Sequence, residues 1–345
     1  MNSTNRSILI AFIKCGTPST IILQTRGEYG DIMGDMLDSV AATLPEPNMS
    51  PMISYLSFDA EKGQLPGWAS VDGFDAVFIT GSSYSAFNSQ PWIWKLGSFI
   101  KAIYKDKPNI RLFGSCFGHQ IICHSLFKEL EKNSPLPTSP SLPGSLPLYP
   151  VVSRNPSGWE LGVHPIKLSE AFMARFGKVS SNPDCQSTMR LRLIHQDHVN
   201  PLSLPKDFVN VGSSERCDIQ GIYKRGRVLT LQGHPEFDNN IMVEFGKPLL
   251  GKGIMDEVKT GPDDYEYGAR AILEFLFEEA DVKATEEVIE GKVGAEGGIM
   301  QEDVMERLIV LFNKLTVLGV ASDKKSGDKS RVVSSESLLV VAAEL

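Results

Sequence analysis

The order of apolar segments constrains the fold of this chain more than any other feature. Short apolar runs with the composition of β-strands alternate with longer segments whose apolar residues recur at helical spacing. The strand-like runs are 7–12, 76–80, 110–113, 208–212, 221–223 and 228–232, and the helical segments are 32–44, 92–104, 120–130 and 265–279. Continuous apolar strands between helices are typical of a mainly parallel sheet. The sequence therefore predicts an α/β fold with helices on both faces of that sheet.

A cysteine between two glycines stands where one predicted strand, 110–113, meets its helix. The intervening residues 114–118 read Gly-Ser-Cys-Phe-Gly. A side chain at the tip of a sharp strand–turn–helix bend has strained backbone angles, so residues two positions away must be small. The helix would also direct its free N–H groups and positive dipole end at the sulfur, which favours a thiolate. A lone cysteine is more often buried and inert, but this pattern predicts that Cys116 is a nucleophile at the ligand-binding edge of the sheet.

The segment after the strand 228–232 offers the base that such a thiol needs. His234 and Glu236 are two residues apart, and Pro235 restricts the backbone between them. Residues two apart in an extended segment project to the same side. Glu236 can therefore accept the proton of one imidazole nitrogen and leave the other nitrogen facing the sulfur. An ordinary turn with an exposed glutamate would have the same sequence.

These motifs resemble those of the class I, triad-type glutamine amidotransferases. The family motifs read G-x-C-x-G-x-Q and, more than a hundred residues later, H-P-E, which match 114–120 and 234–236 here. Residues 79–82 are similar to the oxyanion loop of the family, and 195–199 to its S-H-x-D-x-V segment. Residues 158–162 resemble the G-W-x-x-G stretch of a subgroup that stands alone without a synthetase domain and is related to GMP-synthase-type amidotransferases and γ-glutamyl peptidases.

The likeness extends over about residues 7 to 280. Together with the alternation of strands and helices it predicts a flavodoxin-like domain over residues 1–280. For the site it implies Cys116 as nucleophile, His234 as base and Glu236 as the group that orients the base.

Further residues of the site follow from the same resemblance. The backbone N–H groups of Phe117 and Ser82 would form an oxyanion hole, with Gly81 giving a tight loop. Ser82 stands where the family more often has a second glycine. The amide of Gln120 would hold the amino-acid end of the substrate, although an ordinary helix residue would fit there equally well. His195 and Asp197 are again two apart and are candidates to line the pocket. No metal ligand set is expected, because no third ligand lies near them.

The chemistry implied is attack of a thiolate on a γ-glutamyl amide through a thioester intermediate. As a glutamine amidotransferase the chain would release ammonia or pass it to a separate synthetase, since the sequence has no P-loop of its own. As a γ-glutamyl peptidase it would use the same residues on glutathione-like conjugates. The third alternative is a regulatory module without catalytic activity. The presence of all three residues, Cys116, His234 and Glu236, argues against it. The small-molecule substrate is the main partner expected, and no cofactor is implied.

Composition excludes several other classes of protein. The 345 residues are 42% hydrophobic, which is enough for a large core. A net charge of −8 argues against nucleic acid or an anionic membrane as a partner. Five cysteines without a C-x-x-C pair predict neither a disulfide framework nor a zinc site. The apolar run 8–13 is too short for a secretion signal, and no run reaches the length of a membrane span. A protein of the cytoplasm or the nucleus is the expectation.

Two segments depart from this domain. Residues 133–150 contain six prolines, which predicts an exposed extended insertion that either acts as a spacer or edges the pocket. Residues 281–345 begin with a glycine-rich stretch, continue with apolar residues at helical spacing over 301–318 and end in a polar run. The sequence predicts a flexible tether with one amphipathic helix and a polar tail, which docks on the domain or on a partner.

Overall fold

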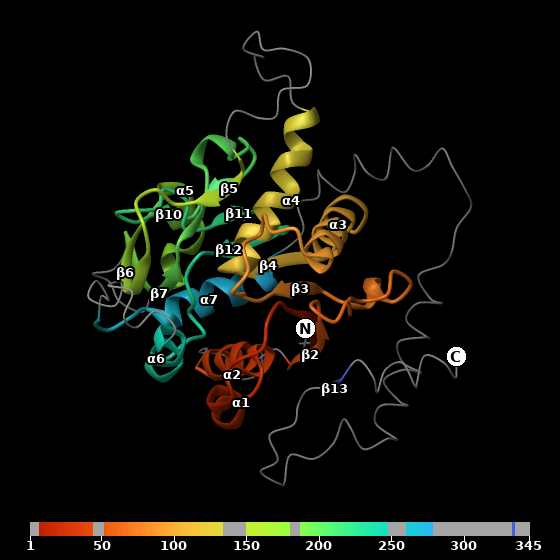
Figure 1. Ribbon diagram of the computed structural model, residues 1–345, viewed down its shortest axis with the longest axis horizontal. Helices are drawn as coiled ribbons and strands as arrows, with labels where there is room; N and C mark the ends of the chain where they lie inside the picture. The colour runs from red at the N-terminus through yellow and green to blue at the C-terminus, as the bar shows by residue number, and fades with distance from the viewer. Residues whose placement is uncertain are drawn as a thin grey trace, which may run out of the picture.

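An eight-stranded sheet forms the centre of the molecule in a computed structural model, which describes residues 7–43, 52–133, 150–179, 187–247, 260–278 and 333–334 (Figure 1). In spatial order the strands are β13 (Val333–Ser334), β2 (Met52–Asp59), β1 (Ser7–Lys14), β3 (Ala76–Ile79), β4 (Arg111–Ser115), β12 (Val228–Leu231), β11 (Ile222–Lys224) and β9 (Val209–Asn210). All neighbours from β13 to β12 are parallel, and β11 pairs antiparallel with both β12 and β9. The predicted mainly parallel, flavodoxin-like sheet is confirmed.

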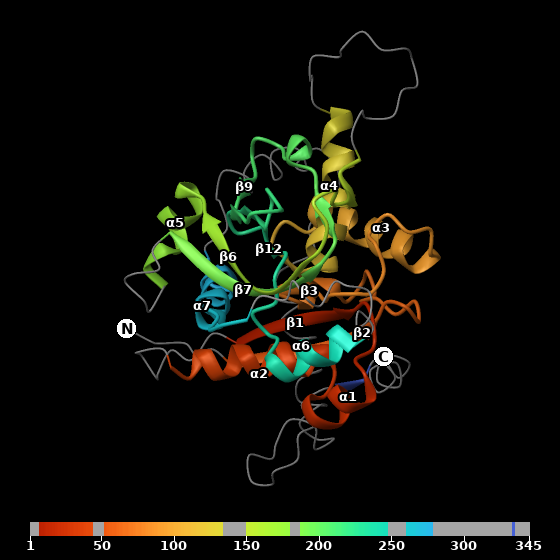
Figure 2. The same cartoon turned by 60° about the vertical axis from the view of Figure 1, so that its left-hand side comes forward.

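Helices cover both faces of this sheet, as Figures 1 and 2 show. The helices are α1 (Thr20–Arg26), α2 (Tyr29–Ala41), α3 (Pro91–Asp106), α4 (Phe117–Asn133), α5 (Glu170–Phe176), α6 (Asn239–Gly246) and α7 (Tyr265–Leu276). Side chains alternate along β1, so that Ile8, Ile10 and Phe12 pack with α2 and α7, whereas Ala11 and Ile13 pack on the side of α3 and α4. The continuous apolar runs of the sequence thus supply two cores, one on each face.

A smaller antiparallel sheet lies beside the carboxyl end of β12. It has the order β10 (Gly212–Ser213), β6 (Glu160–Leu168) and β7 (Thr188–His195), and a separate pair joins β5 (Val152–Arg154) to β8 (Asp197–Val199). In Figure 2, β6 and β7 form a long twisted ribbon above α7. Buried and partly exposed residues alternate along β7, because only one of its faces packs on the core. The sequence analysis assigned no strand to either β6 or β7, and this is its largest omission in the fold.

Most other predicted elements differ from the structure only at their ends. The helix predicted from residue 32 begins at Tyr29, because Glu28 and Asp31 form a reciprocal capping box there. The run 208–212 contains parts of two strands, β9 and β10, which belong to different sheets. The strand β2, which the sequence analysis also left out, pairs with β1 over its whole length.

The insertion and most of the tail lie outside the described residues. Those residues are 134–149, 279–332 and 335–345. Within the predicted polar tail the structure describes only β13, which pairs parallel with β2 through Val333 and Ser334. The sequence analysis had predicted no strand in this region.

Candidate active site

The register of the central sheet brings the two predicted motifs together. β4 and β12 are neighbouring parallel strands, with Ser115 paired to Leu231. Cys116 follows β4 directly, and its N–H donates to the Leu231 carbonyl at 2.9 Å. The segment that begins at Gln232 continues from β12. Because parallel strands end at the same edge of a sheet, Cys116 and His234 meet there although 118 positions separate them in the sequence.

Cys116 occupies a strained bend between β4 and α4. Its φ of 51° makes it the one non-glycine residue with positive φ among the residues that the structure describes. Such a conformation is disfavoured for a residue with a Cβ, and strain of this kind concentrates at functional sites. The side chain is 7% exposed. The bend therefore holds the sulfur at the end of the strand in a fixed place.

The two flanking glycines are required by close backbone contact. A Cβ atom on Gly114 would lie 2.4 Å from the carbonyl carbon of Gly118. A Cβ atom on Gly118 would lie 2.1 Å from the carbonyl oxygen of Ile79. Neither glycine has positive φ. They are needed because the absence of a Cβ lets the backbones of β4, α4 and the end of β3 lie in close contact. The strained residue is the cysteine itself.

His234 and Glu236 form a buried pair. Nδ1 of His234 lies 2.8 Å from Oε1 of Glu236, and the two side chains are 2% and 6% exposed. The ring of His234 also lies beside the Cys116 side chain, which acts on the pKa of the ring, and it stacks on Phe237 with ring centres 3.9 Å apart. The N–H of His234 donates to the Arg192 carbonyl on β7 at 2.9 Å. The ring is thus held between the sulfur on one side and the carboxylate on the other.

The charge state of His234 follows from these contacts. Burial alone would lower the pKa of His234, but the Glu236 carboxylate and the hydrogen bonds to Cys116 and Glu236 outweigh it and raise that pKa to about 10. At neutral pH the ring is therefore an imidazolium. An imidazolium beside Cys116 can stabilise a thiolate and can donate a proton.

Two residues of this site escaped the sequence analysis. The hydroxyl of Ser115 donates to Oε1 of Glu236 at 3.2 Å, so this oxygen accepts two hydrogen bonds. Tyr29, the first residue of α2, packs beside Phe237 with ring centres 6.4 Å apart. Burial, followed by the negative charge of a Cys116 thiolate, raises the pKa of the Tyr29 phenol. Neither residue had a signal in its local sequence, because both contacts join distant segments.

The predicted oxyanion residues lie around Cys116. A Cβ atom on Gly81 would be 3.1 Å from Cε1 of His234 and 3.7 Å from Cβ of Cys116, so the loop after β3 touches both side chains. The Ser82 hydroxyl accepts a hydrogen bond from the Tyr84 N–H at 3.2 Å. Among the described residues, the N–H groups of Phe117 and Ser82 donate to no backbone carbonyl. The N–H of Phe117 is one of the unpaired donors of the first turn of α4.

Gln120 is engaged inside the protein. Its Nε2 donates to the Asp197 carbonyl and to Oε1 of Gln232, both at 3.0 Å, and the residue is 3% exposed. Both amide hydrogens are therefore used in joining α4 to β8 and to the segment after β12. His119 is also buried, with Nδ1 2.7 Å from Oγ1 of Thr230. Burial, and next the charge of His195, lower the pKa of His119 to about 3, so its ring is neutral.

The side chains of His195 and Asp197 contact the protein rather than the sulfur. His195 faces Glu160, and Asp197 lies 3.3 Å from Nε of Arg154. It is the carbonyl of the preceding residue, Ile194, that lies 4.0 Å from Sγ of Cys116. Within the described ranges no group of three or more His, Cys, Asp and Glu side chains is arranged to hold a metal ion. In the same described ranges, each helix is too short or too polar to cross a membrane.

A cysteine on a strand–turn–helix bend, facing a histidine–carboxylate pair at the edge of a mainly parallel sheet, defines a class of thiol-dependent α/β enzymes. The chain belongs to the class I glutamine amidotransferase family, whose model matches residues 56–244, more than half of its length.

Curated relatives agree with this family, and a solved structure shares the fold. The chain is 28% identical to a glutamine amidotransferase-like protein of Schizosaccharomyces pombe over 78% of this chain and 98% of that one. It is 26% identical to gamma-glutamyl peptidase 3 of Arabidopsis thaliana over 56% of this chain and 68% of that one. The fold is similar to the crystal structure of a glutamine amidotransferase from Methylobacillus flagellatus, with a TM-score of 0.51 at 13% identity over 81% of this chain and 98% of that one.

Proposed function

We propose that the protein is a thiol amidase that cleaves a γ-glutamyl amide through the triad Cys116, His234 and Glu236. The thiolate of Cys116 attacks the γ-carbonyl carbon, and the N–H groups of Phe117 and Ser82 hold the oxyanion that forms. His234 donates its proton to the leaving nitrogen as the C–N bond breaks, which leaves a γ-glutamyl thioester. Water then attacks the thioester, gives its proton to His234 and releases glutamate and the thiolate.

One observation carries this proposal. The ring of His234 lies beside Cys116, next to Gly81, and its Nδ1 is 2.8 Å from Glu236, so nucleophile, base and orienting carboxylate form one chain of contacts. Each member is placed by a different constraint: Cys116 by the bend, His234 by its bond to β7, and Glu236 by Ser115. Cys123, which is also buried, instead lies 3.7 Å from Nδ1 of His119, whose pKa is lowered to about 3, so its neighbour is a neutral ring.

With glutamine as substrate the leaving group is ammonia, and we propose this as the main reaction. The ammonia would be released or used by a separate synthetase. The test is to incubate the purified protein with glutamine and to measure ammonia, with Cys116→Ala as the inactive control. Cys116→Ala should be folded but without turnover, since the thiolate is the nucleophile. Full activity of Cys116→Ala would refute the site.

Relatives named as γ-glutamyl peptidases favour a second candidate. Besides the match described above, three further Arabidopsis thaliana proteins with this name match the chain at 24–27% identity. In that case the leaving group would be the amine of a peptide such as cysteinylglycine, and the triad would act in the same way. Assaying glutathione beside glutamine, and measuring cysteinylglycine beside ammonia, distinguishes the two candidates directly.

A further inference from the structure

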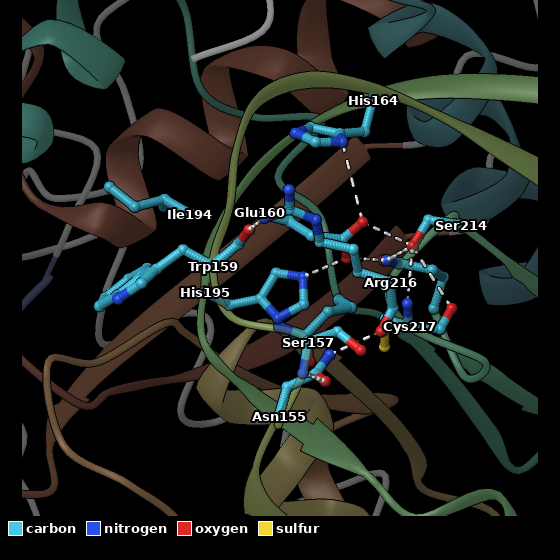
Figure 3. A network of polar contacts seen from close by, with 12 residues as sticks. Asn155, Ser157, Trp159, Glu160, His164, Ile194, His195, Ser214, Arg216 and Cys217 are labelled. Carbon is cyan, nitrogen blue, oxygen red and sulfur yellow. Dashed lines mark hydrogen bonds and ion pairs between the residues drawn. The ribbon is translucent and has the colours of Figure 1, made fainter. Parts of the chain in front are cut away.

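A buried carboxylate, that of Glu160, lies at the centre of a network of polar contacts (Figure 3). Glu160 is the first residue of β6 and is 0% exposed. Its Oε1 accepts a hydrogen bond from the Ser214 hydroxyl at 2.7 Å, and its Oε2 accepts one from Nε2 of Gln220 at 2.8 Å. Nε2 of His195 lies 3.1 Å from Oε2, and Nδ1 of His164 lies 3.7 Å from Oε1. The proposed reaction uses none of these side chains.

The ring of His195 lies between the Glu160 carboxylate and the backbone of Asp197. Nδ1 lies 3.0 Å from the carbonyl oxygen of Asp197, and Nε2 lies 3.1 Å from the Glu160 carboxylate. Both of these groups can only accept hydrogen bonds when the carboxylate is ionised. Burial would raise the pKa of Glu160, but the hydrogen bonds to His195 and Ser214 hold it below its ordinary value. The ring of His195 therefore lies in contact with both the Glu160 carboxylate and the Asp197 carbonyl.

This bridge continues to the elements that carry the triad. The Asp197 carbonyl also accepts a hydrogen bond from Nε2 of Gln120, in the first turn of α4, and Nε2 donates as well to Gln232. Gln232 precedes His234 by two residues. Immediately before His195, the Ile194 carbonyl lies 4.0 Å from Sγ of Cys116. Buried polar contacts thus connect Glu160, through His195, the Asp197 carbonyl and Gln120, to Gln232 in the segment that carries His234.

We propose that Glu160 is a positioning residue that fixes the end of β7 as the wall of the substrate pocket opposite Cys116. It acts through His195, which sets the place of the Ile194 and Asp197 carbonyls, and it touches none of the reacting atoms. The inference rests on the proposed function, because a wall opposite the nucleophile matters only if a substrate is seated against it. It also gives the Gly-Trp-Glu-Leu-Gly segment at 158–162 a physical role, since that segment delivers Glu160.

The test compares two reagents on Glu160→Gln. A diazoketone analogue of glutamine must be seated in the pocket before it alkylates Cys116, whereas iodoacetamide needs only the thiolate. We expect Glu160→Gln to lower the rate of labelling by the analogue by about tenfold or more, since small displacements of a binding wall have large effects on rate. Iodoacetamide labelling of the Cys116 peptide, followed by mass spectrometry, should be unchanged.

Glu278→Gln is the matched control. Glu278 is also a buried carboxylate with three hydrogen-bond donors, from Tyr223, Arg175 and Gly226, but it contacts Arg111 at the opposite end of β4. Its replacement should change neither labelling rate. If Glu160→Gln does not fold, Ser214→Ala removes one hydrogen bond from the same carboxylate and should slow only the analogue.

The outcomes separate this inference from the proposed function. If the wild type reacts with iodoacetamide but not with the glutamine analogue, the proposed function fails, and the inference fails with it. If the analogue labels the wild type and the Glu160→Gln protein equally fast, only the role of Glu160 is refuted. Equal slowing of both reagents would also refute it, because that result indicates damage to Cys116 itself.

Discussion

Cys116 has a positive φ, which among the other described residues is found only at glycines. His234 is protonated at neutral pH, where an exposed histidine would be mostly neutral. Both properties come from direct neighbours. The bend needs Gly114 and Gly118, and the charge needs Glu236 and Cys116. At the scale of single residues the site is therefore a set of pairwise contacts that can be removed one by one.

Substitutions at His234, Glu236 and Ser115, taken in order along the chain of contacts that begins at Cys116, should reduce kcat by progressively smaller factors. His234→Ala removes the acid and base, and we expect a loss on the order of 10²- to 10⁴-fold in kcat. Glu236→Gln keeps the ring oriented but loses the charge, so its loss should be smaller. Ser115→Ala removes one hydrogen bond to the carboxylate, about 1 kcal/mol, which corresponds to about tenfold or less. Ammonia release measured for all three variants checks the order, and equal small losses would contradict the triad.

The pH dependence of activity should report the raised pKa of His234. A group with a pKa of about 10 stays protonated below that pH and loses its proton above it. The proton donor for the leaving nitrogen is therefore present throughout the neutral range, and kcat/KM should fall only as the pH rises through about 10. Ammonia release at low glutamine concentration over the neutral and alkaline range measures this. A fall already near 6.5, the ordinary value of histidine, would contradict the buried ion pair.

The elements around the site come from two different sheets. β4 and β12 are neighbouring parallel strands of the central sheet and α4 follows β4 directly, so their ends meet because parallel strands end at a common edge. β7 approaches the site from the smaller sheet and contributes the Ile194 carbonyl and the bond to His234. The site therefore depends on the close approach of α4 to β3, and on the docking of the second sheet.

Gly118→Ala tests the approach of α4 to β3. The added Cβ atom would lie 2.1 Å from the Ile79 carbonyl oxygen, so backbone must move. We expect destabilisation of about 1–3 kcal/mol and slower labelling of Cys116 by the glutamine analogue. Gly177→Ala is the control, because its Cβ would meet only Cβ of Met173 at 3.8 Å in a helical backbone conformation. Urea unfolding measures both, and equal stability of the two variants would contradict the steric account.

At the scale of the whole molecule, all residues proposed for catalysis precede residue 237, and the matched family region ends at 244. We propose one domain over 1–280 with the insertion at 133–150, followed by a tether and an amphipathic helix over 281–345. The contact that the structure describes between the tail and the domain is the short pairing of β13 with β2. Two paired residues form a small part of an eight-stranded sheet.

Truncation after residue 285 should therefore leave catalysis intact. A domain with its own core folds without a segment that adds few contacts to it. We expect the truncated protein to be labelled by the glutamine analogue and to release ammonia at the rate of the full chain. As a control, Val333→Pro in the full-length chain disrupts the pairing of β13 with β2 and leaves the remainder of the tail in place. If the truncated protein is not labelled, the tail completes the core, and the proposed division into domain and tether is wrong.

The amino-acid sequence by itself determined the features that depend on near neighbours. Apolar runs predicted β1, β3, β4 and β12 of the parallel part of the sheet, though not β2 or β13, and Gly-Ser-Cys-Phe-Gly predicted the bend. The side chains of His234 and Glu236 lie together as predicted, although residues 235–236 form a turn and not the extended segment that was expected. Each depends on sterics or periodicity within a few residues, which a sequence displays directly.

The tertiary structure alone decided which distant groups surround these motifs. Ser115 meets Glu236 across 121 positions, and Glu160 gathers partners from β6, from the end of β7 and from the segment 214–220. The pairing of β6 with β7 is antiparallel and non-local, and no motif marks which residues will face each other across it. Such contacts are set by the packing of whole strands against a common core, where a residue's partners depend on the register and the burial of segments far from it in the chain.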